Sequence, residues 1–532
     1  MKVARVSGHY ESIAPSSLRG GLMVCGTTSD AGKSQIVGGL CRVLARRGVR
    51  VAPFKAQNMA NNSYVTASGH EIGRAQGVQA MAARVTAEVS MNPILLKPES
   101  DRLSQVVVRG VSIGSLSAAE YHARKPELLE LVLESLTDLR SRFDVVICEG
   151  AGSPTEINRL DHDIVNLRIA HEAGFAAIVV GDINPGGVFA ALYGTVALLP
   201  RRLRDHVGGF IINKFRGDPA LLFDGTAQLE RACGVATFGV VPWLEGLTLD
   251  AEDSMGLTGF GGTICGTFAG DPLDVVVLRL PRISNYTDFD PLCIEPGVSV
   301  RFVEHPSALG RPDLVIIPGS KATVADLEWV RRMGFVEAFA KSSAPLLGIC
   351  AGYQMLGQVI DDPVESGSTV EGLGLLPVQT QFHQDKLTRQ TIGRCLGQVV
   401  GGYQIHHGRV TRTNDTGENW MTLASATGEP SDEVRCDVGG RMIAGTTMHG
   451  LFESDDFRAA FLRDVAARNA KTFVPSGVSF SAAREAQIDR VADALEEHVD
   501  LARVFGLVAR GPVAHSLAVV GDAQRFESSG NT

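Results

Sequence analysis

A glycine-rich segment near the start of the chain has the residue types of a phosphate-binding loop. Five residues, instead of the standard four, separate Gly26 from Gly32, and a Lys-Ser pair follows. Backbone N–H groups and the dipole of a following helix would bind a polyphosphate there. We expect Lys33 to reach the terminal phosphates and the Ser34 hydroxyl to ligate Mg²⁺. The nucleotide-binding residues expected in this loop are Gly26, Thr27, Asp30, Gly32, Lys33 and Ser34.

The position of this segment distinguishes a phosphate loop from a chance Gly-Lys-Ser in a glycine-rich turn. It follows the apolar run Leu22 to Cys25 and precedes a stretch, Ile36 to Leu44, whose apolar residues recur on one helical face. A strand before the loop and an amphipathic helix after it are the context that a phosphate loop requires. The longer spacer resembles that of dethiobiotin synthetase and its relatives, which use ATP to phosphorylate a carboxylate. That resemblance implies ATP as a substrate.

Polar side chains at the ends of further apolar runs could complete the nucleotide site. Glu149 follows the run Phe143 to Cys148, so we expect its carboxylate at the sheet edge beside the loop, as a Mg²⁺ ligand together with Ser34. Asp182 ends the next run and is placed similarly, although either acid could instead cap a helix. Asn213 is a candidate for contacting the nucleotide base, because a carboxamide both donates and accepts hydrogen bonds. An ordinary loop role for Asn213 is the alternative.

A second motif has the form of a nucleophile elbow built around a cysteine. Gly348-Ile349-Cys350-Ala351-Gly352 follows an apolar run and precedes a helix-like stretch. The glycines permit the sharp turn that exposes the thiol, and the following helix N-terminus favours the thiolate. The Ala351 N–H can face an oxyanion. The alternative is a buried structural cysteine, which this context disfavours.

A histidine downstream of the elbow could serve as the base for this thiol. The order Cys350 then His449 resembles the class I glutamine amidotransferases, in which the cysteine attacks the glutamine amide and releases ammonia. The resemblance implies catalytic roles for both residues and an oxyanion contact at Gly319. Those domains normally carry Glu two residues after the histidine, where this chain has Leu451. Glu453 is a possible substitute, which leaves the carboxylate partner of the histidine open.

Four longer segments resemble the adenosylcobyric acid synthases, over about Gly21 to Phe461. The resemblance implies conversion of the b, d, e and g carboxylates of adenosylcobyrinic acid a,c-diamide into amides through acyl phosphates. Glutamine, ATP and Mg²⁺ would be required, and the substrate would be a cobalt corrinoid. The four segments are Thr27–Ser34, Pro53–Ala60, Arg279–Asp290 and Gly348–Gly357.

Three alternatives remain beside this resemblance. The first is a cobyrinic acid a,c-diamide synthase. Those enzymes usually have an acidic Gly-Pro-Asp segment where this chain has Gln57-Asn58-Met59, and this difference favours amidation of the b, d, e and g carboxylates. An amidotransferase acting on a different carboxylate is the second. The third is a partition-type P-loop ATPase switch, against which the cysteine elbow argues.

Two further segments depart from the patterns expected for these families. Asn184-Pro185 stands where Asp and Arg are expected, and Gln404 stands where Glu is usual. The roles of that loop and of that strand therefore stay open. His406 and His407 invite a metal interpretation, but neighbouring side chains on a strand point to opposite faces, so we expect no metal there.

The elements that must position these residues are short apolar runs alternating with helix-like stretches. Runs without polar alternation suit strands covered on both faces, as in a parallel doubly wound sheet. We therefore predict an α/β protein with an N-terminal P-loop, dethiobiotin synthetase-like domain (21–255) and a C-terminal class I glutamine amidotransferase, flavodoxin-like domain (273–465). The other expected segments are a disordered extension (1–20), a glycine-rich linker (256–272), a helical segment (466–511) and a polar tail (512–532).

Composition narrows the class of protein further. The chain has 532 residues, is 44% hydrophobic and carries a formal net charge of −9, which describes a globular protein with large cores. A mildly acidic balance disfavours general nucleic-acid binding. Because no apolar run suggests a signal peptide or a membrane helix, we expect a cytoplasmic protein without membrane contact. The oligomeric state cannot be deduced from the sequence.

Overall fold

The computed structural model describes residues 17–158, 160–247, 250, 271–424 and 433–512. Most of the expected glycine-rich linker, 256–272, lies outside these residues, as do 1–16 and the tail from 513. The expected disordered extension over 1–20 is wrong for its last four residues. Leu18 is buried at 1% exposure and the first strand begins at Gly20, so this part of the chain belongs to a folded core.

The N-terminal half is built on a six-stranded parallel sheet with the order β12-β11-β10-β1-β9-β2. Its strands are nearly continuous apolar runs because helices cover both faces of the sheet. This confirms the predicted α/β P-loop architecture. The strands are β1 (Gly20–Gly26), β2 (Val51–Phe54), β9 (Val145–Glu149), β10 (Ala176–Asp182), β11 (Val207–Phe215) and β12 (Thr237–Pro242).

Alternate residues of β1 show how the two faces of this sheet are covered. Leu22 and Val24 belong to one apolar cluster, with helices α1, α13 and α14, whereas Met23 and Cys25 belong to another, with α3, α4, α5 and α7. Successive side chains of a strand point to opposite faces, so one strand contributes to both cores. The helices are α1 (Lys33–Arg46), α3 (Ala118–Arg142), α4 (Leu167–Ala173), α5 (Val188–Leu198), α7 (Phe223–Cys233), α13 (Phe480–His498) and α14 (Leu501–Arg510).

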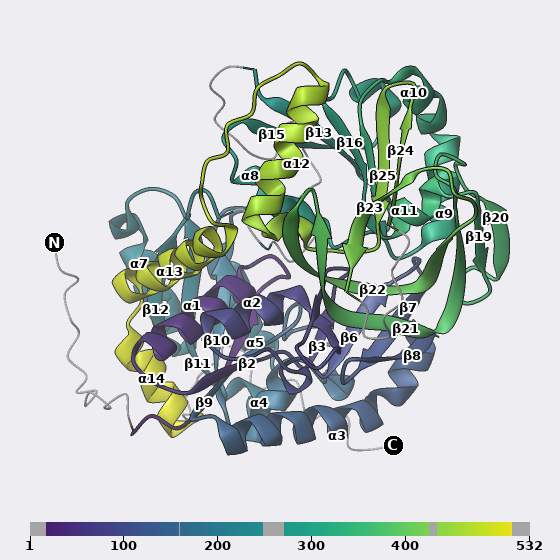
Figure 1. The fold of residues 1–532 in the computed structure, drawn as a ribbon. Coiled ribbons are helices and arrows are strands. Elements are labelled where there is room, and N and C mark those ends of the chain that lie inside the picture. Colours follow the sequence, from purple (N-terminus) through teal and green to yellow (C-terminus); the bar gives the residue numbers. More distant parts are fainter. Residues whose placement is uncertain (1–16, 159, 248–249, 251–270, 425–432, 513–532) are drawn as a thin grey trace.

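The last two helices return from the C-terminal half to cover the N-terminal sheet. Figure 1 shows α13 and α14, in yellow, beside the purple and blue elements of that half. A Cβ at Gly39 in α1 would lie 2.6 Å from Leu495 Cδ1 of α13, so a glycine allows the two helices to approach closely. Buried Arg42 of α1 pairs with Glu485 and Asp489 of α13. The end of the chain therefore ties the two halves together.

An insertion after β2 forms a small second layer at the junction of the halves. It contains a four-stranded sheet with the order β3-β6-β7-β8, a two-stranded antiparallel pair β4–β5, and helix α2. The bounds are β3 (Gln57–Met59), β4 (Ser63–Val65), β5 (Glu71–Gly73), α2 (Arg74–Ala82), β6 (Ile94–Pro98), β7 (Leu103–Val108) and β8 (Val111–Ser117).

The C-terminal half is built on an eleven-stranded mixed sheet whose centre is parallel. The parallel part has the order β15-β13-β16-β18-β25. The extension beyond β25 is antiparallel except for the parallel pair β19–β21, and it includes the long antiparallel pair β21–β22. The parallel strands are β13 (Leu273–Leu278), β15 (Val298–Val303), β16 (Leu314–Ile317), β18 (Leu346–Ile349) and β25 (Arg441–Thr446). The extension contains β19 (Val359–Asp362), β20 (Ser368–Glu371), β21 (Val378–Cys395), β22 (Gln398–Arg412), β23 (Glu418–Leu423) and β24 (Glu433–Val438).

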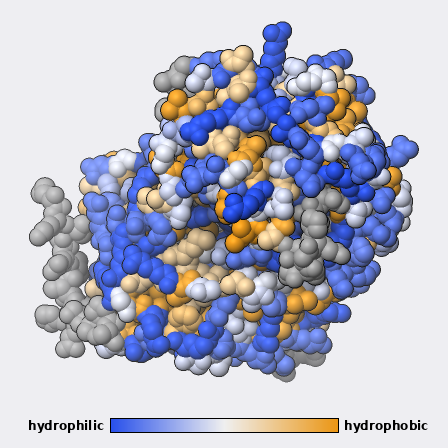
Figure 2. All heavy atoms as spheres, viewed as in Figure 1, coloured by the Kyte–Doolittle hydropathy of each residue, from blue (hydrophilic) through white to orange (hydrophobic). Residues whose placement is uncertain are grey.

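Helices and short elements complete this half, as the predicted amidotransferase-like architecture requires. The helices are α8 (Asp290–Cys293), α9 (Thr323–Arg332), α10 (Phe335–Lys341), α11 (Ala351–Leu356) and α12 (Asp455–Arg468). Strand β14 (Ile283–Ser284) pairs with β17 (Gly319–Ser320). The 3₁₀ helix η6 (Tyr286–Phe289) follows β14 in the chain, and the 3₁₀ helix η8 (Leu451–Glu453) follows His449. Figure 2 shows hydrophilic residues over most of the face seen in Figure 1, with hydrophobic ones in smaller groups between them. Across the described part of the chain, every helix is too short or too polar to cross a membrane.

Candidate active sites

The phosphate loop connects β1 to α1, and its glycines are required by space and conformation. Gly32 has a φ of +92°, and a Cβ at this position would lie 2.2 Å from Asn213 Nδ2. A Cβ at Gly26 would lie 2.8 Å from the carbonyl oxygen of Thr28. Only glycine tolerates both the left-handed conformation and this close approach. The loop is therefore held in one shape by its neighbours.

Lys33 lies folded over this loop. Its Nζ donates to the carbonyl oxygens of Thr28 at 2.8 Å, Ser29 at 2.9 Å and Gly152 at 3.4 Å. The side chain is 4% exposed. An ammonium held against the backbone of a phosphate loop is suited to binding a terminal phosphate. Contact of Lys33 with the terminal phosphates of ATP stays a prediction.

Asn213 and Asp182, from neighbouring strands, brace the loop from the side. Asn213 is 4% exposed and its Nδ2 donates to Ala31 O at 3.0 Å. Lys214 donates to Asp182 Oδ2 at 2.8 Å and to the carbonyl oxygen of Asp30 at 2.5 Å. These contacts give Asn213 and Asp182 a role in holding the loop. Contact of Asn213 with a nucleotide base stays a prediction.

Glu149 and Ser34, the two predicted Mg²⁺ ligands, are brought together at the end of β9. The Ser34 hydroxyl donates to Glu149 Oε1 at 2.8 Å, and the carboxylate is 1% exposed. Lys55 donates to the same oxygen at 2.8 Å, and Gln79 donates to Oε2 at 2.5 Å. One hydroxyl and one carboxylate beside a phosphate loop form the oxygen donor set that Mg²⁺ takes together with substrate phosphates. The residues present therefore fit the ion.

Cys350 occupies the elbow between β18 and α11. Its φ of 52° and ψ of −109° are strained for a residue with a Cβ. A Cβ at Gly352 would lie 1.9 Å from Ile317 O, and a Cβ at Gly348 would lie 2.7 Å from the carbonyl carbon of Gly352. Both glycines are therefore needed for the strand and helix to pack this tightly. This geometry is that of a nucleophile elbow.

His449 follows β25 and lies beside the elbow, but its carboxylate partner is not the one considered from the sequence. Its Nδ1 lies 2.7 Å from Asp288 Oδ2, and the Gly450 N–H donates to Asp288 Oδ1 at 2.9 Å. Asp288 belongs to η6, far earlier in the chain. Cys350 is close enough to His449 to raise the pKa of the imidazole. Cysteine, histidine and aspartate thus form a triad-like arrangement.

Glu453, the substitute partner suggested by the sequence, is wrong for this role. The turn η8 directs its carboxylate to Arg74 at 2.7 Å and to Arg484 at 3.0 Å. Burial alone would raise the pKa of Glu453, but the two guanidinium groups outweigh it and lower that pKa. Glu453 is therefore an anion that joins α2 and α13 to the C-terminal half.

The electrostatic setting of His449 favours its protonation during a reaction. Burial by itself lowers the pKa of this imidazole, but the charges of Asp288 and Cys350 outweigh burial and raise the pKa to about 10. A histidine that accepts a thiol proton beside a carboxylate leaves the resulting thiolate–imidazolium pair stabilised. The same proton can then be given to a leaving group.

The predicted oxyanion residues lie at the same place. Gly319 belongs to β17, and a Cβ there would lie 2.9 Å from His449 Cε1, so only glycine leaves the imidazole room. Ala351 is the first residue of α11 and lines, with Cys350 and Gln354, a cavity of about 40 Å³. Lys97 from β6 lines the same cavity, so both halves of the molecule contribute to it.

The histidine pair in β22 has partners that explain it without a metal. His406 Nδ1 lies 2.6 Å from Gly408 O, and His407 Nδ1 lies 3.0 Å from His383 O. Within the described ranges, no cluster of three or more His, Cys, Asp or Glu side chains could hold a metal ion. Gln404 instead bonds with Thr447 at 2.7 Å and accepts from Arg389 at 2.8 Å.

Several residues of these sites were not assigned a role from the sequence. Lys55 and Asp288 both lie inside segments that resemble the adenosylcobyric acid synthases, so the sequence carries a signal for these two residues. Gln79 is a buried amide on α2 and had no such signal. The helices and loops that bring these side chains to the sites come from distant parts of the chain, which spacing alone does not reveal.

Comparisons with known proteins match both halves of the chain. The family described as CobQ/CobB/MinD/ParA nucleotide binding domain matches residues 22–256, and that described as CobB/CobQ-like glutamine amidotransferase domain matches residues 274–457. A cobyric acid synthase from Streptomyces avermitilis is 49% identical over 93% of this chain and 97% of its own. One from Rhodococcus jostii is 50% identical over 94% of this chain and 97% of its own. One from Mycolicibacterium paratuberculosis is 49% identical, over 94% and 99%.

Proposed function

Because the chain belongs to the cobyric acid synthase family, we propose that it converts the b, d, e and g carboxylates of adenosylcobyrinic acid a,c-diamide into amides. It is an amide-forming ligase that joins a nucleotide-binding domain to a glutamine amidotransferase domain. The observation that carries the proposal is the presence in one chain of a phosphate loop with Ser34 against Glu149 and of Cys350 against a His449–Asp288 pair.

In the first half-reaction, the phosphate loop holds ATP while a corrinoid carboxylate oxygen attacks the γ-phosphorus. The bond to the β-phosphate oxygen breaks, which leaves ADP and an acyl phosphate. Lys33 and the loop N–H groups stabilise the charge that develops on the phosphoryl oxygens. Ser34 and Glu149 would hold Mg²⁺, whose charge neutralises the phosphates when it is bound. Ammonia then attacks the acyl carbon, phosphate leaves, and an amide remains.

In the second half-reaction, the Cys350 thiolate attacks the side-chain amide carbon of glutamine. His449 takes the thiol proton and passes it to the departing nitrogen, so that ammonia leaves and a thioester remains. The Ala351 N–H and the Gly319 loop are suited to the oxyanion. Water, deprotonated by His449, then hydrolyses the thioester to glutamate. Asp288 fixes the imidazole orientation throughout.

The role of Glu149 gives the first prediction. Glu149→Gln keeps the size of the side chain but removes the charge that would hold Mg²⁺. We expect the amidation rate to fall by about 10²-fold at low Mg²⁺, because metal charge stabilisation contributes several kcal/mol. High Mg²⁺ should restore part of the rate. Initial rates measured across a Mg²⁺ titration in both proteins test this.

An alternative role for Glu149 makes a different prediction for the same measurements. If its carboxylate serves only to anchor Lys55 and Ser34, the variant should have a lower thermal unfolding midpoint and an unchanged Mg²⁺ dependence. A midpoint close to the parent value combined with a shifted Mg²⁺ requirement supports the metal role. An unshifted requirement contradicts it.

Asp288 gives the second prediction. Asp288→Asn removes the charge that orients and stabilises the His449 imidazolium, so glutamine hydrolysis should slow by about 10²–10⁴-fold. The pKa of His449 should fall from its raised value, because burial then lacks its main opposing charge. Glu453→Gln is the matched control, since it neutralises a nearby carboxylate that lies against arginines instead of His449. Glutaminase rates decide between the two carboxylates: equal losses in both variants would contradict the assignment.

The alternatives are separated by a substrate comparison. Mass spectrometry of adenosylcobyrinic acid a,c-diamide incubated with ATP and glutamine should show four successive small mass decreases, each an OH replaced by NH₂. The unamidated corrinoid acid offered in parallel should react poorly, whereas a preference for it would indicate an a,c-diamide synthase. A partition-type ATPase would hydrolyse ATP and leave both corrinoids unchanged.

A further inference from the structure

The pair β4–β5 of the N-terminal half is packed against the strands that carry the glutaminase residues. Val65 of β4 forms a buried apolar cluster with Tyr403 and Ile405 of β22. Gln390 of β21 donates to Val65 O at 3.1 Å. Ser63, at the start of β4, is 0% exposed. The insertion therefore forms part of the wall around His449.

The backbone of Ser63 binds the two side chains that flank the imidazole. Its N–H donates to Asn285 Oδ1 at 2.8 Å, and its carbonyl accepts from the Tyr403 hydroxyl at 3.4 Å. Asn285 Nδ2 lies 3.3 Å from His449 Nε2. The Tyr403 ring stacks on the imidazole, with centroids 5.4 Å apart and planes 21° from parallel. One residue of the N-terminal half thus reaches both sides of His449.

The Ser63 contact determines which end of the Asn285 amide faces the histidine. A peptide N–H only donates, so it selects the Oδ1 end, and the NH₂ group must then point to His449 Nε2. An NH₂ group only donates, so it pairs with an unprotonated Nε2. The other ring nitrogen, Nδ1, then carries the proton toward Asp288. This is the neutral tautomer, and it accepts the thiol proton of Cys350 when the thiol replaces the Asn285 NH₂ group at the single lone pair of Nε2. The raised pKa of His449 includes the charge of Cys350, so it describes the imidazolium beside the thiolate, after this transfer.

Asn285 is held in this orientation by more than one bond. Its φ of 51° lies in the left-handed region, which Asn tolerates better than most residues. The neighbouring Tyr286 N–H donates to Asn62 Oδ1 at 3.2 Å. Asn62 and Ser63, adjacent in the chain, therefore fix Asn285 and Tyr286, also adjacent. All four residues are at most 6% exposed.

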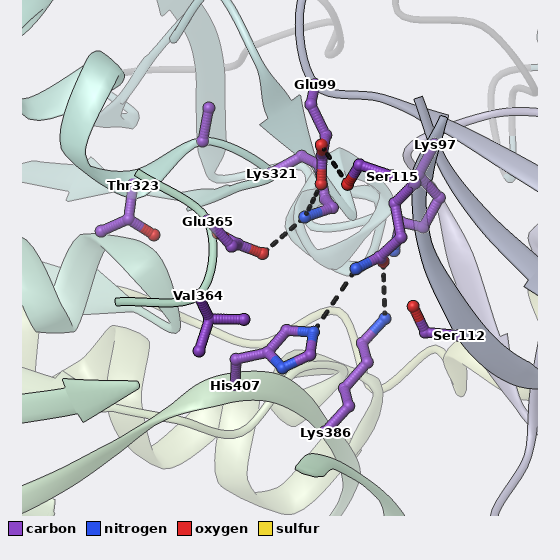
Figure 3. A network of polar contacts seen from close by, with 12 residues as sticks. Lys97, Glu99, Ser112, Ser115, Lys321, Thr323, Val364, Glu365, Lys386 and His407 are labelled. Carbon is purple, nitrogen blue, oxygen red and sulfur yellow. Dashed lines mark hydrogen bonds and ion pairs between the residues drawn. The ribbon is translucent and has the colours of Figure 1, made fainter. Parts of the chain in front are cut away.

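A buried ionic network anchors Ser63 itself. Lys97 donates to Ser63 Oγ at 2.8 Å, and Ser63 Oγ donates to Glu71 Oε1 at 2.6 Å. Lys386 of β21 donates to the other oxygen of Glu71 at 2.5 Å. Figure 3 shows Lys97 of the N-terminal half and Lys386 of the C-terminal half in one region of polar contacts, which also contains His407. The position of Ser63 therefore depends on contact between the halves.

We infer that Asn285 is a positioning residue of the glutaminase. Ser63 of the synthetase half orients its amide so that His449 can accept the thiol proton, and this orientation requires the two halves to pack against each other. The inference rests on the proposed glutaminase role of Cys350 and His449. Tyr403 holds the imidazole plane from the other side. Its pKa is raised well above the ordinary value, by burial first and by Asp288 next, so its hydroxyl remains a donor to Ser63.

The variant Asn285→Asp tests this with little change of shape. Aspartate keeps the tolerance for a positive φ and the acceptor for the Ser63 N–H, but it places a carboxylate oxygen beside His449 Nε2. We expect a stabilised imidazolium, a glutaminase kcat lowered about 10–100-fold at neutral pH, and little change in the KM for glutamine. The acid limb of the pH profile should move upward by about 1–3 pH units, the shift that an adjacent opposite charge produces.

The other titratable groups around His449 stay unchanged in this variant. They are Asp288 in η6, Cys350 at the elbow, and Tyr403 and His406 in β22. Asn419→Asp is the matched control, because Asn419 is exposed and bonds with Arg412 away from the site. Its pH profile should coincide with that of the parent.

A second variant and a bypass measurement keep the outcomes distinct. Tyr403→Phe keeps the stacked ring and removes only the bond to Ser63, so a loss of a few-fold in kcat is expected. Amidation from free ammonia should be unchanged in both variants, which excludes misfolding. An Asn285→Asp enzyme with the parent pH profile and kcat would overturn the inference. Glutaminase activity that survives Cys350→Ala would instead overturn the proposed function beneath it.

Discussion

Replacing Cys350 with alanine should abolish amidation from glutamine while amidation from free ammonia continues near the parent rate. In the proposed scheme the Cys350 sulfur is the nucleophile that attacks the glutamine amide, and free ammonia enters the reaction after that step. Cys350 lies in the elbow of the C-terminal half, whereas the ATP residues lie on the N-terminal sheet. Product formation with glutamine and with ammonium salts, measured in both proteins, gives the comparison.

The control for this loss is the histidine variant. His449→Ala should also lose glutamine-dependent activity, though less completely, since a cysteine retains some thiolate unaided. Both variants should keep the ammonia reaction. If Cys350→Ala still hydrolysed glutamine at the parent rate, the C-terminal half would need another nucleophile.

Replacing Lys33 with alanine should slow amidation from both nitrogen sources alike. Its ammonium lies over the phosphate loop, and its contact strengthens as charge develops on the γ-phosphoryl oxygens. Loss of one such stabilising group lowers kcat by about 10²–10³-fold. Rates with glutamine and with ammonium salts at saturating ATP provide the measurement.

Glutamine hydrolysis measured in the same variant serves as the control for folding. Lys33 donates to the carbonyl oxygens of Thr28, Ser29 and Gly152, which lie in the N-terminal half, so the distant elbow should keep its shape. A variant that hydrolyses glutamine but forms no amide supports the assignment. Near-normal amidation with either nitrogen source would contradict a role of the phosphate loop in activating the carboxylate.

The architecture was predictable because strand burial leaves a direct trace in the sequence. Continuous apolar runs, such as Ala176 to Val180, became β10 in the centre of a parallel sheet. The phosphate loop and the cysteine elbow were predictable because each needs glycines at fixed positions next to a strand. At Gly32 and Gly352 a Cβ would overlap its neighbours, which explains the pattern physically.

The carboxylate of the triad was not predictable in the same way. Asp288 precedes His449 by 161 residues, and it reaches the imidazole from a 3₁₀ turn that no local spacing announces. Glu453 lies close to the histidine in sequence, yet η8 turns it toward Arg74 and Arg484. Closeness to His449 in the sequence therefore did not identify its carboxylate partner, because the turn η8 directs Glu453 away from the imidazole.

The docking of the C-terminal helices was also hidden from the sequence. The apolar face of α13 was visible as a helical period, but a period does not identify its partner. That partner is α1 of the N-terminal half, where Gly39 leaves room for Leu495. The contact is decided by packing between distant segments.

The central claim is that nitrogen released from glutamine at Cys350 is joined to corrinoid carboxylates activated at the phosphate loop. Glutamine labelled with ¹⁵N in its side-chain amide, incubated with ATP and adenosylcobyrinic acid a,c-diamide, tests it directly by mass spectrometry of the product. We predict a corrinoid that carries four labelled amides, and none with the Cys350→Ala protein. A corrinoid that stays unamidated while glutamine and ATP are consumed would contradict the claim.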